Sequence, residues 1–463
     1  MSSNSKIIDT HAHLDFPQFD SDRPQVIERA KKAGVEYMVN VGSSLEGSRR
    51  SVELAGISKF IYATVGIHPH DAAKVDDKVF AELELLAKGE RVVGIGEIGL
   101  DYYKSKVPKG LQQEAFRRFL DLAVRLKLPA IIHNRDADDD TLTILKEFSA
   151  KGLKGVMHCF SGDEEYLKEC LGLGLYVSFT CNITFKNAKR LREVCCNTPI
   201  ERLMLETDCP FLAPQVVRGS RNEPANLRYL VELLAELKGL TVEDVARITT
   251  YNAKSFFSIP LTDVEALPRI AYNIRDSLYL NITNRCSNGC SFCTRGISDF
   301  VKGHNLTLER EPTFEEVIAA MGDVSAYKEI VFCGFGEPTL RLDLICQVAK
   351  YLKEKRAKVR LVTNGHGNLI HKRSIVSDLR AIIDRVSISL DVDSKEKYLK
   401  ICKPQFGPGT YDNIIDFIKE CKSAGLDVEV TCLDIEGVNI KKCKELAKGL
   451  GVEFRQRHLN MVG

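Results

Sequence analysis

The sequence predicts an α/β protein of two successive units, an N-terminal (β/α)8 TIM barrel followed by a partial (β/α)6 barrel. Two features of the pattern lead to this fold class. Short apolar runs alternate with amphipathic stretches along the whole chain, and one proline-containing segment interrupts the alternation. The 463 residues are also too many for one ordinary core, since a domain averages ~150 residues.

Each apolar run in the first half has the length of a buried strand. The stretches between them, such as residues 112–126, have the period of helices that cover a sheet. Eight strand–helix units in about 250 residues are what a (β/α)8 barrel needs. The expected strands are residues 7–13, 37–41, 60–68, 92–100, 130–133, 155–160, 175–180 and 203–208. We therefore assign residues 1–258 to the first unit.

The second half repeats the pattern with fewer strands. Six are expected, at residues 277–282, 329–333, 359–363, 385–390, 428–433 and 453–457. Residues 259–271 contain Pro260 and Pro268, and proline disfavours a continued helix, so we expect this segment to be a linker. Residues 272–463 then form the second unit.

Charge and cysteine content limit the classes of function. A formal net charge of +2 gives no global attraction to nucleic acid, so any phosphate contact has to be local. Fifteen cysteines, an odd number in a chain of this length, indicate thiols and thiolate ligands rather than disulfides. The first residues lack the charged and apolar regions of a secretory signal, and no run of about 18 apolar residues occurs. We expect a cytoplasmic protein without a membrane partner.

Polar residues stand at the ends of the expected strands of the first unit. Because side chains alternate along a strand, His11 and His13 point the same way and can bind one metal ion. The other strand-end residues are His68, His70, Glu97, Asp101, His133, Arg135, His158 and Asp208. A TIM barrel builds its active site at these carboxyl ends, so six of the ten histidines converge on one mouth. Imidazoles with carboxylates suit zinc, manganese or iron, and a glutamate can bridge two ions.

Seven sequence blocks of the first unit resemble the TatD family of metal-dependent hydrolases. They are HAHLD (11–15), GIHPH (66–70), GEIGLDYY (96–103), HNRDA (133–137), HCFSG (158–162), ETDCPFLAP (206–214) and RNEP (221–224). The resemblance implies two divalent ions (Mg, Mn or Zn), the first held by His11, His13, Glu97 and Asp208 and the second by Glu97, His133 and His158. It also implies nuclease-type hydrolysis, with DNA or another phosphodiester as the partner.

The implied reaction assigns roles to further side chains. Asp208 can accept a proton from the attacking water, while Glu97 bridges the two ions. His68 and Arg135 are expected to face the phosphate, and arginine suits bidentate phosphate contacts. The alternative is an amide or ester bond, because the same pair of ions activates water against a carbonyl group equally well.

Three cysteines follow the first expected strand of the second unit and form an incomplete metal site. They are Cys286, Cys290 and Cys293. A [4Fe-4S] cluster has four irons, so three thiolates leave one iron open to a reactant. The alternative is a zinc site with His304 as the fourth ligand. A second cluster is disfavoured, because the spacings of 19, 11 and 11 residues among Cys402, Cys421, Cys432 and Cys443 match no compact motif.

The CxxxCxxC spacing, with an aromatic residue before the last cysteine, resembles the radical S-adenosylmethionine (SAM) superfamily. Gly336 and Glu337 lie in GFGEP (334–338), which resembles the GGEP motif that meets the methionine amino group, although Phe335 displaces one of its adjacent glycines. Asn364 and Ser389 stand where this family contacts the ribose or carboxylate of the cofactor. The resemblance implies a radical SAM barrel with one [4Fe-4S] cluster and SAM, and an electron donor such as flavodoxin or ferredoxin. SAM would yield a 5'-deoxyadenosyl radical that abstracts hydrogen from an unknown substrate.

Two explanations of the fusion remain open. Both barrels act on one substrate or pathway, or one barrel is catalytically silent and serves as a docking or regulatory module. Complete ligand sets in both halves favour the first explanation.

Overall fold

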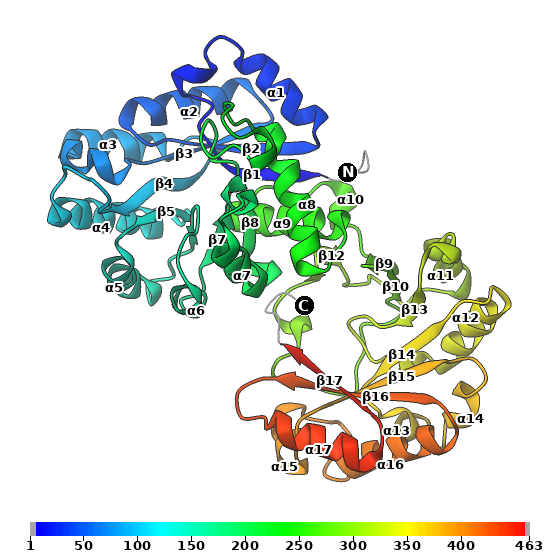
Figure 1. The fold of residues 1–463 in the computed structure, drawn as a ribbon. Helices are drawn as coiled ribbons and strands as arrows, with labels where there is room; N and C mark the ends of the chain where they lie inside the picture. Colours follow the sequence, from blue (N-terminus) through cyan, green and yellow to red (C-terminus); the bar gives the residue numbers. More distant parts are fainter. Residues whose placement is uncertain (1–5, 459–463) are drawn as a thin grey trace. The chain divides into compact units, whose positions relative to one another are not determined.

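The computed structural model describes residues 6–458 of the chain. The chain divides into two compact units between Leu261 and Thr262. Figure 1 shows that each unit has a central sheet with helices along its outside, as expected for α/β architecture. No helix within residues 6–458 is both long and apolar enough to cross a membrane.

The first unit is an eight-stranded parallel barrel, which confirms the predicted fold class. Its strands follow chain order around the sheet and are β1 (Ile7–Ala12), β2 (Val35–Val41), β3 (Ile61–Val65), β4 (Val92–Asp101), β5 (Ala130–Arg135), β6 (Gly155–Met157), β7 (Tyr176–Phe179) and β8 (Leu203–Leu205). A parallel bridge between Ala12 and Cys209 joins the first strand to the segment after the last one. The helices are α1 (Arg23–Lys32), α2 (Leu45–Ile57), α3 (Asp77–Leu86), α4 (Lys109–Leu126), α5 (Asp138–Ser149), α6 (Glu164–Gly172), α7 (Lys189–Asn197), α8 (Leu227–Lys238) and α9 (Val242–Phe257).

One end of the barrel is filled by apolar side chains. Inward-facing residues of the strands, among them Ile8, Val39 and Met204, form a core cluster with Phe256 and Phe257 at the end of α9. Most strand residues of this cluster lie near the amino ends of their strands, where Ile8, Val93, Ile131, Val156 and Met204 are each the second residue. The barrel is therefore plugged at that end, and its polar residues gather at the opposite, carboxyl end.

Helix α9 ends at Phe257, just before the segment that the sequence predicts to be a linker. A capping box of Thr241 and Asp244 begins the helix, and Ser258 ends it in the left-handed conformation. Ile259 still packs in the same cluster as Phe256. The segment expected to be a linker thus begins inside the core of the first unit.

The second unit contains a seven-stranded sheet, where the sequence predicted six strands. Its order is β17 (Glu453–His458), β16 (Asp427–Asp434), β15 (Arg385–Asp391), β14 (Val359–Thr363), β13 (Glu329–Phe332), β10 (Ser277–Leu280) and β9 (Ala271–Ile274). The six strands from β10 to β17 are parallel, as a partial (β/α)6 barrel requires, and β9 pairs antiparallel with β10. A separate hairpin contains β11 (Phe300–Val301) and β12 (His304–Asn305).

Helices line the outside of this sheet. They are α11 (Phe314–Met321), α12 (Leu342–Glu354), α13 (Gly367–His371), α14 (Val376–Leu379), α15 (Lys395–Ile401), α16 (Thr410–Ser423) and α17 (Ile440–Leu450), with the short α10 (Asp263–Ala266) before β9. The core between helices and sheet is built from residues such as Ile330, Val348 and Ile388.

The additional strand is held by tertiary contacts that a period cannot reveal. Tyr272 of β9 packs with Leu306 and Phe335 in a small apolar cluster, and its hydroxyl donates to the carbonyl of Cys333 at 3.2 Å. Asn281 donates its backbone N–H to the carbonyl of Ile270 at 2.8 Å. β9 has four residues, too few to show an alternation by themselves.

Candidate metal centre and cluster site

The carboxyl ends of the barrel strands in the first unit surround one cavity. Its volume is about 760 Å³. It is lined by residues from several strand ends, including His13, His68, His70, Glu97, Asp101, His133, Arg135, His158 and Asp208. The structure thus brings together the strand-end residues that the sequence singled out, with His11 buried beneath them.

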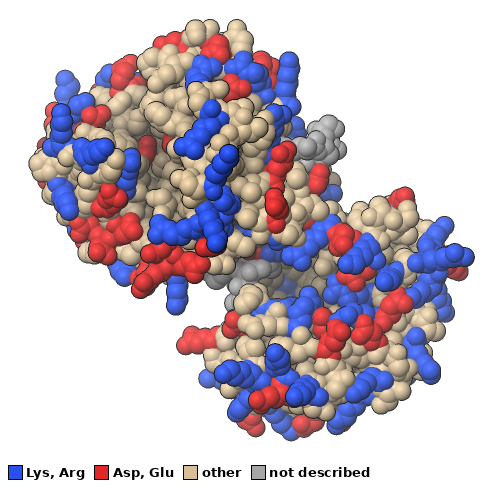
Figure 2. All heavy atoms as spheres, in the orientation of Figure 1, with Lys and Arg blue, Asp and Glu red and all other residues tan. Residues whose placement is uncertain are grey.

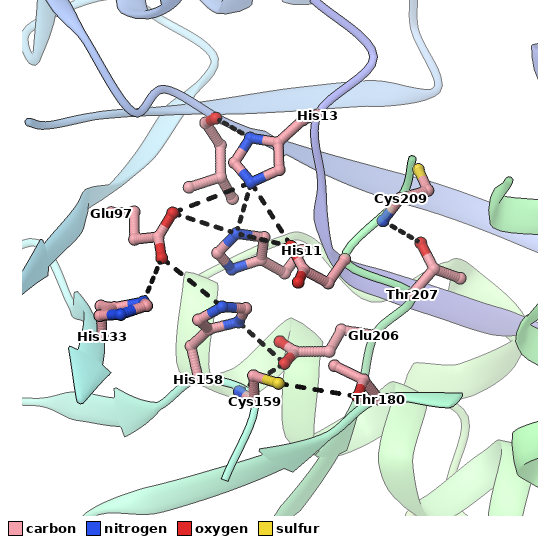
Figure 3. Close-up of polar contacts among 12 residues, drawn as sticks. His11, His13, Glu97, His133, His158, Cys159, Thr180, Glu206, Thr207 and Cys209 are labelled. Atoms are coloured by element: carbon pink, nitrogen blue, oxygen red, sulfur yellow. Dashed lines mark hydrogen bonds and ion pairs between the residues drawn. The ribbon is translucent and has the colours of Figure 1, made fainter. Parts of the chain in front are cut away.

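The first group of possible ligands surrounds two facing imidazoles. His11 Nε2 and His13 Nε2 lie 3.1 Å apart, and each is 3.8 Å from Glu97 Oε2. Asp208 Oδ1 lies 3.9 Å from His11 Nε2 and 3.5 Å from His13 Nε2. The Asp208 N–H donates to the His11 carbonyl at 2.9 Å, so the backbone after β8 carries this carboxylate to β1. Figure 3 shows His11, His13 and Glu97 directed toward one another.

The second group surrounds the other oxygen of the same glutamate. Glu97 Oε1 lies 2.7 Å from His133 Nδ1, 3.6 Å from His158 Nε2 and 3.9 Å from His68 Nε2. The ring of His158 stacks on that of His11 with centroids 3.6 Å apart. Glu97 therefore stands between both groups, as a bridging carboxylate would.

Several residues that position these side chains were not assigned roles from the sequence. Glu206 Oε1 lies 2.9 Å from His158 Nδ1, and Asp101 Oδ2 lies 3.2 Å from His133 Nε2. His13 donates from Nδ1 to the carbonyl of Val41 at 2.9 Å. Metal-binding imidazoles are usually oriented through their second nitrogen in this way. Glu206 opens the ETDCP block, so that motif was the available signal.

The pKa shifts in this centre show that positive charge stabilises its carboxylates. Burial alone raises the pKa of Glu97, but His68, His133 and His158 outweigh it and hold that pKa well below its ordinary value. Burial lowers the pKa of His13 and His133, yet the carboxylates that contact them outweigh burial and raise both values to about 9. A divalent cation would replace these protons.

The donor set fits divalent metal ions. Ligand atoms lie within 4.8 Å of one another in three groups, namely His11–His158–Asp208, His11–His13–Glu97 and His68–Glu97–His133. Burial lowers the pKa of His11 well below its ordinary value, which leaves a neutral imidazole with a free lone pair. Imidazole and carboxylate ligands suit zinc and manganese. Besides the predicted ligands, His68 also belongs to one of these groups.

The mouth of the cavity carries aromatic and cationic side chains. The guanidinium of Arg135 lies 3.8 Å above the ring of Tyr103, which is 38% exposed. Phe211, also on the cavity wall, is 48% exposed and meets Phe16 edge to face at 6.0 Å between centroids. The ring of Phe16 in turn stacks on His13. Exposed aromatic faces beside a cation are suited to nucleobases and phosphate.

Cys286, Cys290 and Cys293 lie in the loop after β10, and hydrogen-bond donors surround them. Asn288 N–H donates to Cys286 Sγ at 3.4 Å, and Arg295 Nε donates to Cys293 Sγ at 3.3 Å. A hydrogen bond to Cys290, together with burial, raises the pKa of the Cys402 thiol. Donors of this kind stabilise thiolates and therefore suit thiolate ligands.

The three cysteines and His304 are not gathered into a compact zinc site among the described residues. Two sulfurs on one zinc lie at most about 4.6 Å apart, since each Zn–S bond is ~2.3 Å. Among the described residues, every group of three ligand atoms within 4.8 Å of one another belongs to the first unit, so the cysteine triplet is wider. His304 instead lies 3.0 Å from the carbonyl of Asn273 through Nε2. The proposed fourth zinc ligand is thus engaged with the backbone before β10 instead of the cysteine loop.

The predicted cofactor-binding residues take distinct positions around this loop. A Cβ on Gly336 would lie 2.3 Å from the Arg285 carbonyl. The lack of a side chain at Gly336 therefore allows the loop after β13 to contact the backbone of the cysteine loop. The Glu337 carboxylate is buried and accepts from Thr339, Thr363 and the N–H of Asn364. It therefore positions the backbone of Asn364.

The remaining two predicted contacts also have protein partners. The Asn364 amide donates to Ser287 Oγ at 3.0 Å and reaches Cys286 Sγ at 3.8 Å. Ser389 Oγ accepts from Arg457 at 3.3 Å, and Arg457 also pairs with Asp391 at 2.9 Å. Of the other cysteines, Cys432 and Cys443 lie together, 2.9 Å apart, between β16 and α17.

Comparison with known proteins decides the family. The family model described as TatD related DNase matches residues 8–258, more than half of the chain. The chain belongs to this TatD family. The radical SAM superfamily model matches residues 280–450, so the second unit contains a radical SAM domain. Both resemblances found in the sequence are confirmed.

The TatD relatives cover the first unit. An uncharacterized metal-dependent hydrolase, YabD of Bacillus subtilis, is 48% identical over 253 residues, 55% of this chain and 99% of the relative. The 3'-5' ssDNA/RNA exonuclease TatD of Edwardsiella piscicida is 34% identical over 259 residues, 55% of this chain and 100% of the relative. The crystal structure of YJJV, a TatD homolog from Escherichia coli, has a TM-score of 0.53 at 31% identity and covers 55% of this chain and 99% of its own.

The TatD match assigns the first unit to a general class of enzyme. It supports a metal-dependent hydrolase built on a TIM barrel, and it implies metal ions in the first unit. The radical SAM match implies an iron–sulfur cluster and SAM in the second unit.

Proposed function

We propose that the first unit hydrolyses phosphodiester bonds at the ends of single-stranded nucleic acid. The observation that carries this proposal is the convergence of imidazoles on both oxygens of Glu97, beside a cavity whose mouth presents Arg135 on Tyr103 and the exposed Phe211. Unpaired bases stack on such aromatic side chains, whereas bases inside a duplex are not free to do so. The name of the Edwardsiella relative, a ssDNA/RNA exonuclease, supports the same substrate class.

The side chains divide the work of hydrolysis. Two divalent ions, when bound, would stabilise charge on the phosphate and lower the pKa of water. Asp208, with its side chain 15% exposed toward the cavity, accepts the proton of the attacking water. His68 and Arg135 face the phosphate from the cavity wall. Burial lowers the pKa of His68 to about 4, so it acts as a neutral hydrogen-bond partner at pH 7.

The test uses metal-loaded enzyme on several substrate classes. Single-stranded DNA, single-stranded RNA, duplex DNA, bis(p-nitrophenyl) phosphate and p-nitrophenyl acetate are compared with and without a chelator. We expect hydrolysis of the single strands, abolished by the chelator and at least 10²-fold slower in Asp208→Asn. Hydrolysis of the acetate but of none of the phosphodiesters would instead support the carbonyl alternative and refute the proposal.

We propose that the second unit cleaves SAM reductively. When bound, a [4Fe-4S] cluster with one open iron would supply the one-electron chemistry that SAM cleavage requires. Cys286, Cys290 and Cys293 would hold the cluster, and Gly336, Glu337, Asn364 and Ser389 would contact SAM. A flavodoxin or ferredoxin is the proposed source of the electron. The match to the radical SAM superfamily and the hydrogen-bond donors around the cysteines support this proposal.

The corresponding test is anaerobic reconstitution with iron and sulfide, followed by dithionite reduction with SAM. We expect about four irons per chain and formation of 5'-deoxyadenosine, both lost in Cys293→Ala. One zinc per chain, with no iron bound, would contradict the proposal.

A further inference from the structure

Arg295 is tied into the cysteine loop by all three arms of its guanidinium. Nε donates to Cys293 Sγ at 3.3 Å, Nη1 to the carbonyl of Asn284 at 2.8 Å and Nη2 to the carbonyl of Asn288 at 3.2 Å. Both carbonyls belong to residues 284–293, the segment that holds the three cysteines. The side chain therefore closes the loop on itself and places a positive charge against one of its sulfurs.

The nearby Arg285 shows how differently an arginine at this loop can be placed. Its side chain is 62% exposed and forms an ion pair with Glu311 at 2.7 Å. Within residues 6–458, in contrast, Arg295 forms no ion pair with a carboxylate, and its charge faces the thiol of Cys293. An uncompensated cation that is half-buried beside a sulfur is not explained by surface ion pairing.

The charge distinguishes Arg295 from the other donors to this site. Cys286 Sγ accepts from the backbone of Asn288 and lies near the Asn364 amide, and both of these donors are neutral. A neutral donor stabilises a thiolate mainly through its dipole, whereas a guanidinium adds a full positive charge. Hydrogen bonds to cluster sulfurs and local charge both set the reduction potential of iron–sulfur sites.

We infer that Arg295 is a positioning residue that raises the reduction potential of the cluster and holds the loop of Cys293 closed around it. This inference rests on the proposed function, since it requires a cluster at these cysteines. A [4Fe-4S]²⁺ core with three thiolates has a net charge of −1, and one electron from an external low-potential donor takes it to −2. The more negative reduced state gains more from an adjacent cation, so the cation favours electron uptake.

Three variants separate charge from hydrogen bonding. Arg295→Gln removes the charge, Arg295→Lys keeps the charge but loses the three-armed fork, and Arg285→Gln is the matched control at an exposed arginine. Each full-length protein is reconstituted anaerobically, its iron and sulfide are quantified, and its potential is measured by titration monitored by electron paramagnetic resonance.

We expect Arg295→Gln to shift the potential to a more negative value. The reduced-to-oxidised ratio at a fixed potential should fall on the order of tenfold, equivalent to about 59 mV. Arg295→Lys should stay closer to the unmodified enzyme in potential but lose its cluster faster in air, because the loop is no longer closed. Arg285→Gln should match the unmodified enzyme in both measurements.

A second measurement detects the contact between the arginine and the cluster directly. Enzyme made with [guanidino-¹⁵N]arginine is reduced, and pulsed electron paramagnetic resonance should detect a ¹⁵N coupling to the cluster that Arg285→Gln retains. Absence of this coupling, or an unchanged potential in a fully loaded Arg295→Gln protein, would overturn the inference. Failure of the unmodified chain to bind iron would instead refute the proposed function of this unit.

Discussion

Glu206 Oε1 lies 2.9 Å from Nδ1 of His158 and also accepts the N–H of Cys159 at 2.7 Å. Its other oxygen accepts from Ser178 at 2.8 Å, so the carboxylate is fixed from three sides. This contact occupies one nitrogen of the imidazole and turns the other toward Glu97 (Figure 3). Glu206 thus determines which nitrogen of His158 is available to a metal ion.

Replacing this carboxylate by an amide should weaken the metal centre. Glu206→Gln keeps the size of the side chain but removes the charge that orients and polarises His158. We expect metal affinity, measured by competition with a chelator, to fall about 10- to 100-fold. Glu232→Gln, on an exposed position of α8, is the control and should leave the affinity unchanged. Equal affinities in both variants would show that Glu206 only fills space.

The sequence was sufficient to predict which residues meet in the first unit. His11 and Glu97 lie on β1 and β4 and His158 directly follows β6, far apart in the chain, but parallel strands of a barrel all end at the same rim. Alternation along β1 placed His11 and His13 on one side, and the structure has their Nε2 atoms 3.1 Å apart. Periodicity and topology together therefore locate a site without knowledge of its distances.

Contacts made through the fold could not be predicted in the same way. Glu206 lies one residue beyond β8 and is buried, and the ETDCP block marks this residue without showing that its carboxylate contacts Ser178 and His158. β9 was not predicted, for a related reason. It pairs with β10 across a turn, and its burial comes from Leu306 and Phe335. Both features depend on residues brought in from other elements.

Arg285 and Arg295 also show that contacts made through the fold cannot be predicted from the sequence. Figure 2 shows lysine, arginine and acidic side chains interspersed over the visible faces, in line with the small net charge. Arg285 and Arg295 both flank the cysteine triplet, and their positions in the sequence do not distinguish them. Only the structure shows that Glu311 compensates the first and that Cys293 contacts the second.

A methyl group on Gly336 should prevent cluster assembly. Its Cβ would lie 2.3 Å from the Arg285 carbonyl and 2.4 Å from the Thr283 carbonyl, both backbone atoms that cannot rotate away. Gly336→Ala therefore has to displace the start of the cysteine loop. We expect iron incorporation after reconstitution to fall at least tenfold while the fold of both units persists by circular dichroism.

The matched control for this change lies within the loop itself. A Cβ on Gly289 would meet only Lys403, at 3.8 Å, which is an ordinary van der Waals distance. Gly289→Ala should therefore load iron as well as the unmodified protein does. A loss in both variants would indicate that the loop tolerates no substitution, independent of the close approach at Gly336.

The second unit should lose stability in acid because of one buried imidazole. His366 lies 2.8 Å from Ser287 Oγ and 2.9 Å from the Tyr398 hydroxyl, and burial lowers its pKa to about 4. The ordinary value in an unfolded chain is about 6.5. A depressed folded-state pKa means that this stabilisation is complete above pH 6.5 and is lost as the pH falls through 4. The expected loss by pH 4 is about 3 kcal/mol.

Hydrogen exchange followed by mass spectrometry measures this effect by segment. Peptides from β14 and α15, which flank His366 and Tyr398, should exchange faster as the pH falls from 6.5 to 4, after correction for the intrinsic exchange rate. His366→Gln removes the titrating group and should flatten this dependence, whereas His371→Gln should retain it. An unchanged slope in His366→Gln would assign the acid sensitivity to other groups.

Phe335 should stabilise β9, the strand that the sequence did not predict. The ring stands where the related motif has a glycine, is 9% exposed and packs against Tyr272 of β9 and Leu306 after β12. Truncation of a buried phenylalanine to a small residue costs about 3–5 kcal/mol, and here the loss falls on a four-residue strand at the edge of the sheet. Phe335→Gly should therefore accelerate hydrogen exchange in residues 271–274 and leave β14 protected, because β14 pairs on the far side of β13. Phe335→Leu keeps most of the apolar contact and should retain most of the protection. If Phe335→Gly exchanges like the unmodified chain in residues 271–274, the antiparallel pairing with β10 holds that strand without the apolar cluster.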